Sequence, residues 1–164
     1  MRLEYDYDEQ IIYLEKTDGA KEILEDNFPS EPIISPDKTR AVYITPLEWE
    51  TLGSLYLFDL LSGERILLIG PDESSNIPKG VKWIDDHTLA VIIGYGYGTI
   101  TIGGNVFTCN IETREVIQVT NYDSSVQITG LNIDQNTKKA ELEGIRYVDE
   151  NLSEFEKFSQ EVQL

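Results

Sequence analysis

The sequence predicts an all-β protein, a propeller-like array of about three four-stranded antiparallel blades. Three observations lead to this prediction. Apolar and polar residues alternate with a period of two, turn-forming residues separate the alternating runs, and the turns recur about every 50 residues. The chain of 164 residues has the size of one domain, so we assign residues 1–164 to a single propeller-like domain.

Alternation is clearest in the segment SLYLFDL (54–60). In an extended chain Leu55 and Leu57 point to one face, whereas Tyr56, Phe58 and Leu60 point to the other. Comparable runs, rich in β-branched and aromatic residues, occur at 10–16, 39–45, 65–70, 88–94, 105–111, 114–120 and 125–133. We predict a strand in each of these segments.

Two turn patterns repeat along the chain and set the length of a blade. The triplets at 37–39, 86–88 and 135–137 each end one extended segment and begin the next, at a spacing of 49 residues. The phrase DLLSGE (59–64) returns as NIETRE (110–115) at a spacing of 51 residues. A repeat of ~40–50 residues that holds four short strands is typical of a propeller blade.

These periods divide the chain into repeat units at approximately 32–70, 80–121 and 126–164. Residues 10–26 look like the last two strands of a blade, so we expect them to complete the third unit, with the termini sharing one blade. The segment 150–164 fits either a helix or a strand, and the shared parity of Phe158, Val162 and Leu164 favours a strand. Three blades are fewer than the ~4–8 of ordinary propellers. Open sheet edges could therefore pair with a second copy in a homo-oligomer.

The segments ISPDKTRAVYI (34–44) and GSLYLFDLLSGE (53–64) resemble the blade repeat of TolB-like and WD40-like β-propellers, in which an S-P-D-G type turn joins the first two strands. Lys38 replaces the usual glycine, and Arg114 stands where Gly63 stands in the first copy. The stretch VKWIDDHTLAVIIGYGYGTITIGGNVF (81–107) also resembles the DUF4652 family of small bacterial proteins of unknown function. This resemblance implies an architecture and no activity.

The glycine-rich stretch IIGYGYGTITIGGN (92–105) invites comparison with a phosphate-binding loop. Such a loop leads into a helix whose N-terminus binds the phosphate, but here the β-branched residues 99–102 follow. We expect instead that Gly94, Gly96 and Gly98 leave one side of a strand bare, so that a neighbouring sheet packs closely against it. Residues 103–105 would then form a hairpin turn.

Charge and cysteine usage narrow the partners and the compartment. The chain has 30 acidic and 13 basic residues, a net charge of -17 that repels nucleic acid and anionic membranes, so we expect neither as a partner. A protein partner with a basic surface suits this charge. Cys109 is the only cysteine, and residues 1–10 lack the basic and apolar regions of a signal peptide. These observations predict a cytoplasmic protein.

No residues with the pattern of a catalytic, metal or cofactor site stand out. His87, the only histidine, lies in a polar turn, and no G-x-S-x-G motif supplies a nucleophile. Cys109 falls in a predicted strand and suits a small core position. The acidic clusters at 5–9, 71–76 and 134–136 lack the spacing of a calcium loop. We therefore predict no catalytic residue, no metal site and no cofactor.

The candidate binding residues are aromatic or acidic side chains in predicted loops and strand ends. Trp49 lies among acidic residues in the loop 46–53, and Asp85, Asp86, Tyr95 and Tyr97 flank one predicted strand. The leading hypothesis is a non-enzymatic cytoplasmic protein-interaction module with an acidic surface, with an inhibitor or immunity-type protein as its specific form. The alternative is a small-ligand-binding or hydrolytic propeller with a pocket near the last four residues. Convergence of these four side chains would favour the alternative.

Overall fold

The computed structural model describes residues 1–164 and contains fourteen strands and no helix. Four antiparallel sheets follow one another in chain order: β1-β2-β3, β4-β5-β6-β7, β8-β9-β10-β11 and β12-β13-β14. The strands are β1 (Arg2–Asp6), β2 (Ile11–Glu15), β3 (Lys21–Glu25), β4 (Ile33–Ile34), β5 (Arg40–Thr45), β6 (Ser54–Asp59), β7 (Arg65–Ile69), β8 (Asn76–Trp83), β9 (Thr88–Tyr95), β10 (Asn105–Asn110), β11 (Val116–Gln118), β12 (Val126–Asp134), β13 (Lys139–Tyr147) and β14 (Phe155–Gln163). The all-β, propeller-like class is confirmed, but the structure has four sheets in place of about three four-stranded blades, and the first and last sheets have three strands each. No helix of the structure has the length and apolar character needed to cross a bilayer.

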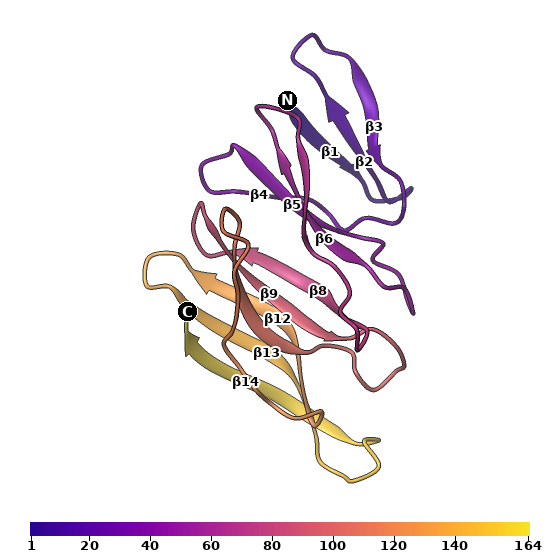
Figure 1. Ribbon diagram of the computed structural model, residues 1–164. Helices are drawn as coiled ribbons and strands as arrows, with labels where there is room; N and C mark the ends of the chain where they lie inside the picture. The colour runs from indigo at the N-terminus through magenta and orange to yellow at the C-terminus, as the bar shows by residue number, and fades with distance from the viewer.

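The array is open, and the shared blade expected from the sequence is not formed. Residues 2–6 form β1, which pairs with β2 and belongs to the same sheet as β3, while β12, β13 and β14 form a separate sheet. Figure 1 shows these two sheets at opposite ends of the array. Leu3 and Tyr5 explain the difference, because both pack on the core of the first sheet and so supply β2 with a local partner strand.

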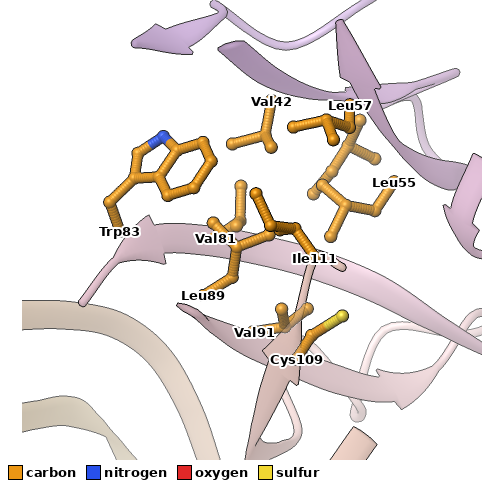
Figure 2. Close-up of a cluster of buried hydrophobic side chains, with 10 residues drawn as sticks. Val42, Leu55, Leu57, Val81, Trp83, Leu89, Val91, Cys109 and Ile111 are labelled. Carbon is orange, nitrogen blue, oxygen red and sulfur yellow. The ribbon is translucent and has the colours of Figure 1, made fainter. Parts of the chain in front are cut away.

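A separate hydrophobic core fills each space between neighbouring sheets. Between the second and third sheets, Val42, Leu55 and Leu57 face Val81 and Leu89, as Figure 2 shows. A second cluster joins the third and fourth sheets, and a third cluster joins the first two. Each sheet in the middle of the array is therefore buried on both faces, which is how a stack of small sheets removes apolar area from water.

Strand β6 shows how the period-two pattern serves two cores at once. Leu55 and Leu57 belong to the cluster between the second and third sheets, whereas Phe58 and Leu60 belong to the cluster between the first and second. The predicted faces of residues 54–60 are thus confirmed. Cys109 is buried in the same cluster as Leu55 and forms no disulfide.

The repeated turns fold in the same way in successive sheets. The backbone amide of Asp59 donates to the Glu64 carbonyl at 2.9 Å, and that of Asn110 donates to the Glu115 carbonyl at 3.0 Å. In each turn the side-chain oxygen of the first residue accepts two backbone N–H bonds at 2.8–2.9 Å. The sequence repeat is therefore a structural repeat.

Charged outer faces end the array on both sides. On the first sheet Arg2 pairs with Glu15 at 2.6 Å, and Lys21 pairs with Glu4 at 2.9 Å. On the last sheet a 2.9 Å ion pair joins Lys139 of β13 to Glu161 of β14. A polar outer face on the terminal units is what allows a stacked array to stop.

The C-terminal segment and the glycine-rich stretch both form hairpin structure. Residues 155–163 form β14, so the preference for a strand is confirmed. Strand β9 ends at Tyr95, the chain loops through 96–104, and β10 begins at Asn105 opposite Ile93. The turn predicted at 103–105 is therefore the end of a longer loop, because Gly103 and Gly104 pack on Ile128 of the next sheet.

Candidate functional site

Asp85 and Asp86 lie in the turn between β8 and β9, where both contact neighbouring sheets. The Asp86 carboxylate accepts a hydrogen bond of 2.9 Å from the backbone N–H of Asp37, the corresponding residue of the preceding repeat. The Asp85 carboxylate lies 3.6 Å from the ammonium group of Lys138, in the corresponding turn of the next repeat. These acids thus join successive sheets.

Tyr95 and Tyr97 lie at the other end of β9, so the four residues do not converge. Strand β9 spans eight residues, which corresponds to roughly 23 Å at the usual rise of about 3.3 Å per residue. The two tyrosine rings contact each other edge to face, with centroids 5.8 Å apart. Tyr95 lines a polar cavity of about 480 Å³ together with Asp72 and Asp123, whereas Asp85 and Asp86 line no part of it. The four residues therefore do not line the common pocket that the alternative hypothesis would require.

Trp49 lies in the loop between β5 and β6, and 63% of its surface is exposed. It lines a cavity of about 420 Å³ that is bounded by loop 46–53, strand β8 and loop 96–104. Leu47 and Ile102 are also exposed and line the same cavity, and Glu48 and Glu50 stand beside Trp49. We name this space the Lys79 cavity, after the only basic residue in its lining.

Lys79 enters this cavity because strand β8 bulges at that position. Pro78 pairs with Ile93 and Gly80 pairs with Ile92, so Lys79 is an extra residue in the ladder. A bulge redirects a side chain that would otherwise follow the alternation of the strand. The Lys79 ammonium group donates a hydrogen bond to the carbonyl oxygen of Thr101, in loop 96–104.

Lys79 differs from the lysines and arginines that form ion pairs. Carboxylates lie within 4.0 Å of Arg2, Lys16, Lys21, Arg65, Lys138 and Lys139. Lys79 has no carboxylate partner, and burial lowers its pKa to about 8. At neutral pH it is still mostly an ammonium ion, so the cavity holds a partly desolvated cation in a strongly acidic protein.

A second cavity of about 320 Å³ adjoins the first. It lies among residues 30–33, strand β8 and strand β12, and it shares Leu47 and Lys79 with the Lys79 cavity. Glu31 and Lys82 are the other ionisable residues in its lining. Lys79 lines both spaces, and together we name them the groove.

Loop 96–104 is held in place by hydrogen bonds at several points. The Tyr147 hydroxyl, on β13, donates to the Ile100 carbonyl at 2.8 Å, and the Thr101 hydroxyl donates to the Tyr97 carbonyl at 2.9 Å. The backbone N–H of Gly96 donates to the Ser75 carbonyl at 2.9 Å. One wall of the Lys79 cavity is therefore preorganised.

Close backbone contacts explain why this loop is rich in glycine. A Cβ atom on Gly103 would lie 2.0 Å from the Ile128 carbonyl oxygen, and one on Gly94 would lie 2.0 Å from the Gly103 carbonyl oxygen. A Cβ atom on Gly96 would lie 2.8 Å from a methyl group of Leu52. Gly94 and Gly96 make close contacts as predicted, but β9 ends at Tyr95, so the predicted bare strand face does not continue to Gly98, which has nothing within 4 Å. Gly103 makes the close contact with the next sheet.

Lys79 was not among the binding residues predicted from the sequence, although its sequence neighbours indicate a bulge. The residues Pro78-Lys79-Gly80 lie inside a strand, and proline and glycine in a strand interior indicate a bulge. The local sequence does not show which residues face Lys79 across the cavity, because Trp49 and Thr101 are more than 20 residues away on either side. The side chains of His, Cys, Asp and Glu nowhere form a group of three or more that could hold a metal ion.

The fold and the open array define a class of protein, the propeller-like assemblies of small antiparallel sheets. The structure is similar to that of a conserved lipoprotein of Clostridium novyi NT, with a TM-score of 0.76 and 21% identity over 95% of this chain and 97% of that chain. It is also similar to a TolB protein of Agrobacterium tumefaciens, with a TM-score of 0.61 and 14% identity over 94% of this chain and 58% of that chain. The β-propeller domain of the Trilobed protease of Pyrococcus furiosus, with an open velcro topology, gives a TM-score of 0.57 and 15% identity over 97% of this chain and 48% of that chain.

Within this class the chain belongs to the family described as a domain of unknown function, DUF4652, whose model matches residues 47–162. The resemblances to the DUF4652 family and to TolB-like blades that the sequence indicated are thus confirmed. A comparison with curated protein sequences found no match. The chain spans about half the length of the TolB and protease neighbours.

The lipoprotein neighbour corrects the cytoplasmic location expected from the sequence. That protein matches this chain over nearly the full length of both, and a lipoprotein is attached to a membrane. The two sequence observations behind that expectation, the composition of residues 1–10 and the single cysteine, do not depend on location. The acidic residues near the N-terminus lie in β1 and its turn, and one buried cysteine forms no disulfide in any compartment.

Proposed function

We propose that this chain is a non-enzymatic protein-binding module whose binding surface is the mouth of the Lys79 cavity. The observation that carries the proposal is that exposed Leu47, Trp49 and Ile102, from two loops about 50 residues apart, gather around one cavity. Exposed apolar side chains that cluster around a hollow are typical of binding sites, and tryptophan is enriched among residues that dominate binding energy.

Charge supports a partner with a basic surface. Glu48 and Glu50 flank Trp49 at the cavity, and the net charge of the chain is -17. Such a charge speeds the approach of a basic protein and repels an acidic one. An inhibitor that covers a basic surface of another protein is the specific form of this proposal. Because Asp85 and Asp86 lie at the opposite end of β9 from Tyr95 and Tyr97, we prefer this proposal to the small-ligand-binding or hydrolytic alternative.

The proposal is tested by affinity capture with three versions of the chain, followed by binding kinetics on each captured protein after purification. The wild-type chain is compared with Trp49→Ala and with Leu61→Ala. Leu61 is a matched control, because it is 76% exposed and lies in the turn at the far end of β6. We expect Trp49→Ala to weaken binding by at least about tenfold and Leu61→Ala to leave it unchanged.

Salt dependence supplies the second measurement. The association rate constant of the purified pair should fall as the salt concentration rises from low to physiological values, because salt screens the attraction between unlike charges. A partner that binds Trp49→Ala as tightly as the wild-type chain contradicts the proposed surface. An association rate that is independent of salt contradicts the role of the acidic charge.

A further inference from the structure

We propose that the Lys79 ammonium group is the receptor for the C-terminal carboxylate of a peptide chain whose last side chain is apolar. The inference rests on the proposed function and names the chemistry of the partner at that surface. It concerns the interior of the Lys79 cavity, whereas the proposed function concerns its mouth.

The first step is that Lys79 has hydrogen-bonding capacity left over. Its ammonium group carries three donors, and the structure pairs it with the Thr101 carbonyl alone. The bulge at Lys79 and the contact with loop 96–104 hold this group inside the groove. A cation that is partly removed from water and lacks an anionic partner is unfavourable, and an incoming anion would relieve that cost.

The second step concerns the size and charge of the anion. Glu48 and Glu50 line the Lys79 cavity, and Glu31 lines the adjoining one, so the ionisable groups around Lys79 are mainly acidic. Lys82, in the adjoining cavity, is the other cation of the groove. Phosphate or a nucleotide would bring two or more negative charges into this field. A single carboxylate balances one ammonium group without that repulsion.

The third step identifies the carboxylate as a chain end. Leu47, Trp49, Ile77 and Ile102 supply apolar walls close to the ammonium group of Lys79. A C-terminal residue carries its carboxylate and its side chain on the same carbon atom, so one residue can satisfy both the cation and the walls. The carboxylate of an Asp or Glu side chain has no apolar group beside it. Capture of a terminal carboxylate is an established mode of peptide recognition.

The fourth step explains how the rest of the peptide would fit. The second cavity shares Leu47 and Lys79 with the first, which gives an extended chain room that a compact ligand does not need. Glu31 lines this second cavity. A basic side chain one or two residues before the terminus would meet that acid. This matches the basic partner of the proposed function.

The test uses the full chain and two synthetic peptides, acetyl-Gly-Lys-Gly-Leu as the free acid and as the C-terminal amide. Binding is measured by isothermal titration calorimetry at neutral pH. We expect the acid to bind at least about tenfold more tightly than the amide, because a hydrogen bond to a charged group is lost in the amide. Lys79→Met should abolish this difference, and Lys79→Arg should retain part of it. Thermal unfolding confirms that both variants are folded.

A second measurement follows Lys79 itself and requires no variant. Competitive acylation with mass spectrometry gives the pKa of each lysine in the free and bound chain. Because burial without a partner lowers the pKa of Lys79 to about 8, a bound carboxylate should raise it towards its ordinary value. The amide peptide should leave it unchanged. Lys157, which is exposed on β14 and lines neither cavity, serves as the internal control.

The outcomes separate this inference from the proposed function. Equal binding of acid and amide, no binding of either peptide, or unchanged discrimination in Lys79→Met would overturn the inference. Equal affinity for acetyl-leucine and the tetrapeptide would also overturn it, in favour of a small organic acid. A captured protein that needs Trp49 but not Lys79 would overturn the inference and leave the proposed function intact.

Discussion

Replacing Gly103 with alanine should separate the third and fourth sheets locally and destabilise the protein. A Cβ atom at this position would lie 2.0 Å from the carbonyl oxygen of Ile128 and 2.7 Å from its carbonyl carbon. Both are backbone atoms, so no side-chain rotation relieves the clash. The two segments would have to move apart by about 1 Å to reach the 3.0 Å below which real Cβ contacts essentially never fall.

The cost follows from the hydrogen bonds that this movement would break. Gly104 and Ile128 exchange two backbone hydrogen bonds, each of 3.1 Å, and Gly103 donates a third of 3.1 Å to the buried side chain of Gln127. Each backbone bond contributes roughly 0.5–1.5 kcal/mol, and an unsatisfied buried amide costs roughly 1–3 kcal/mol. The expected loss in the free energy of unfolding is therefore roughly 2–6 kcal/mol.

The assay is thermal unfolding by circular dichroism, with hydrogen exchange at Ile128 as a local measurement. For a chain of this length the loss corresponds to a fall in Tm of the order of 10 °C, and the Ile128 amide should lose protection. Gly130→Ala is the matched control, since its Cβ would meet Glu143 at an ordinary 3.7 Å. A Gly103→Ala variant with the Tm of the control would show that the glycines do not serve sheet packing.

Three further substitutions test other parts of the reasoning. The Tyr43 hydroxyl is fully buried without a hydrogen-bond partner, so Tyr43→Phe should keep or raise stability in denaturant titrations at neutral pH. Burial raises the pKa of Tyr43 to about 12, so wild-type stability should fall relative to Tyr43→Phe between pH 10 and 12, where only the unfolded tyrosine ionises. Arg114 has a φ of 62°, so Arg114→Gly should raise Tm by about 2–4 °C, whereas Arg114→Ala should not. Gly96→Val should lower the free energy of unfolding by roughly 1–3 kcal/mol in calorimetry, because its Cβ would press on Leu52 and Ile77. Added ATP should not change the stability of either protein. A variant as stable as the wild type would contradict the packing.

Periodicity predicted many of the strands that serve the cores, but not β8 and β13, which supply Val81 and Leu142 to two of them. The alternation in 54–60 assigned each side chain of β6 to the correct face, because side-chain direction in a strand is a local property of the backbone. The repeats at 59–64 and 110–115 predicted turns with matching hydrogen bonds for the same reason. Arg114 stands where the first copy of the repeat has Gly63, and it adopts the same left-handed conformation. The replacement of glycine by arginine therefore did not change the turn.

The number of sheets and the composition of the candidate site depend on contacts that no local pattern records. Local pairing of β1 with β2 removed the need for a shared blade, and the length of β9 separated Asp85 and Asp86 from Tyr95 and Tyr97. Lys79 became part of a cavity because a bulge in β8 turns it towards two loops that are distant in the sequence. In strands with a clear period-two pattern, such as β6, sequence alone determined which residues are extended and which of their faces are buried, since both follow from the period of the backbone. Tertiary structure decided which loops meet, because that depends on how successive sheets stack.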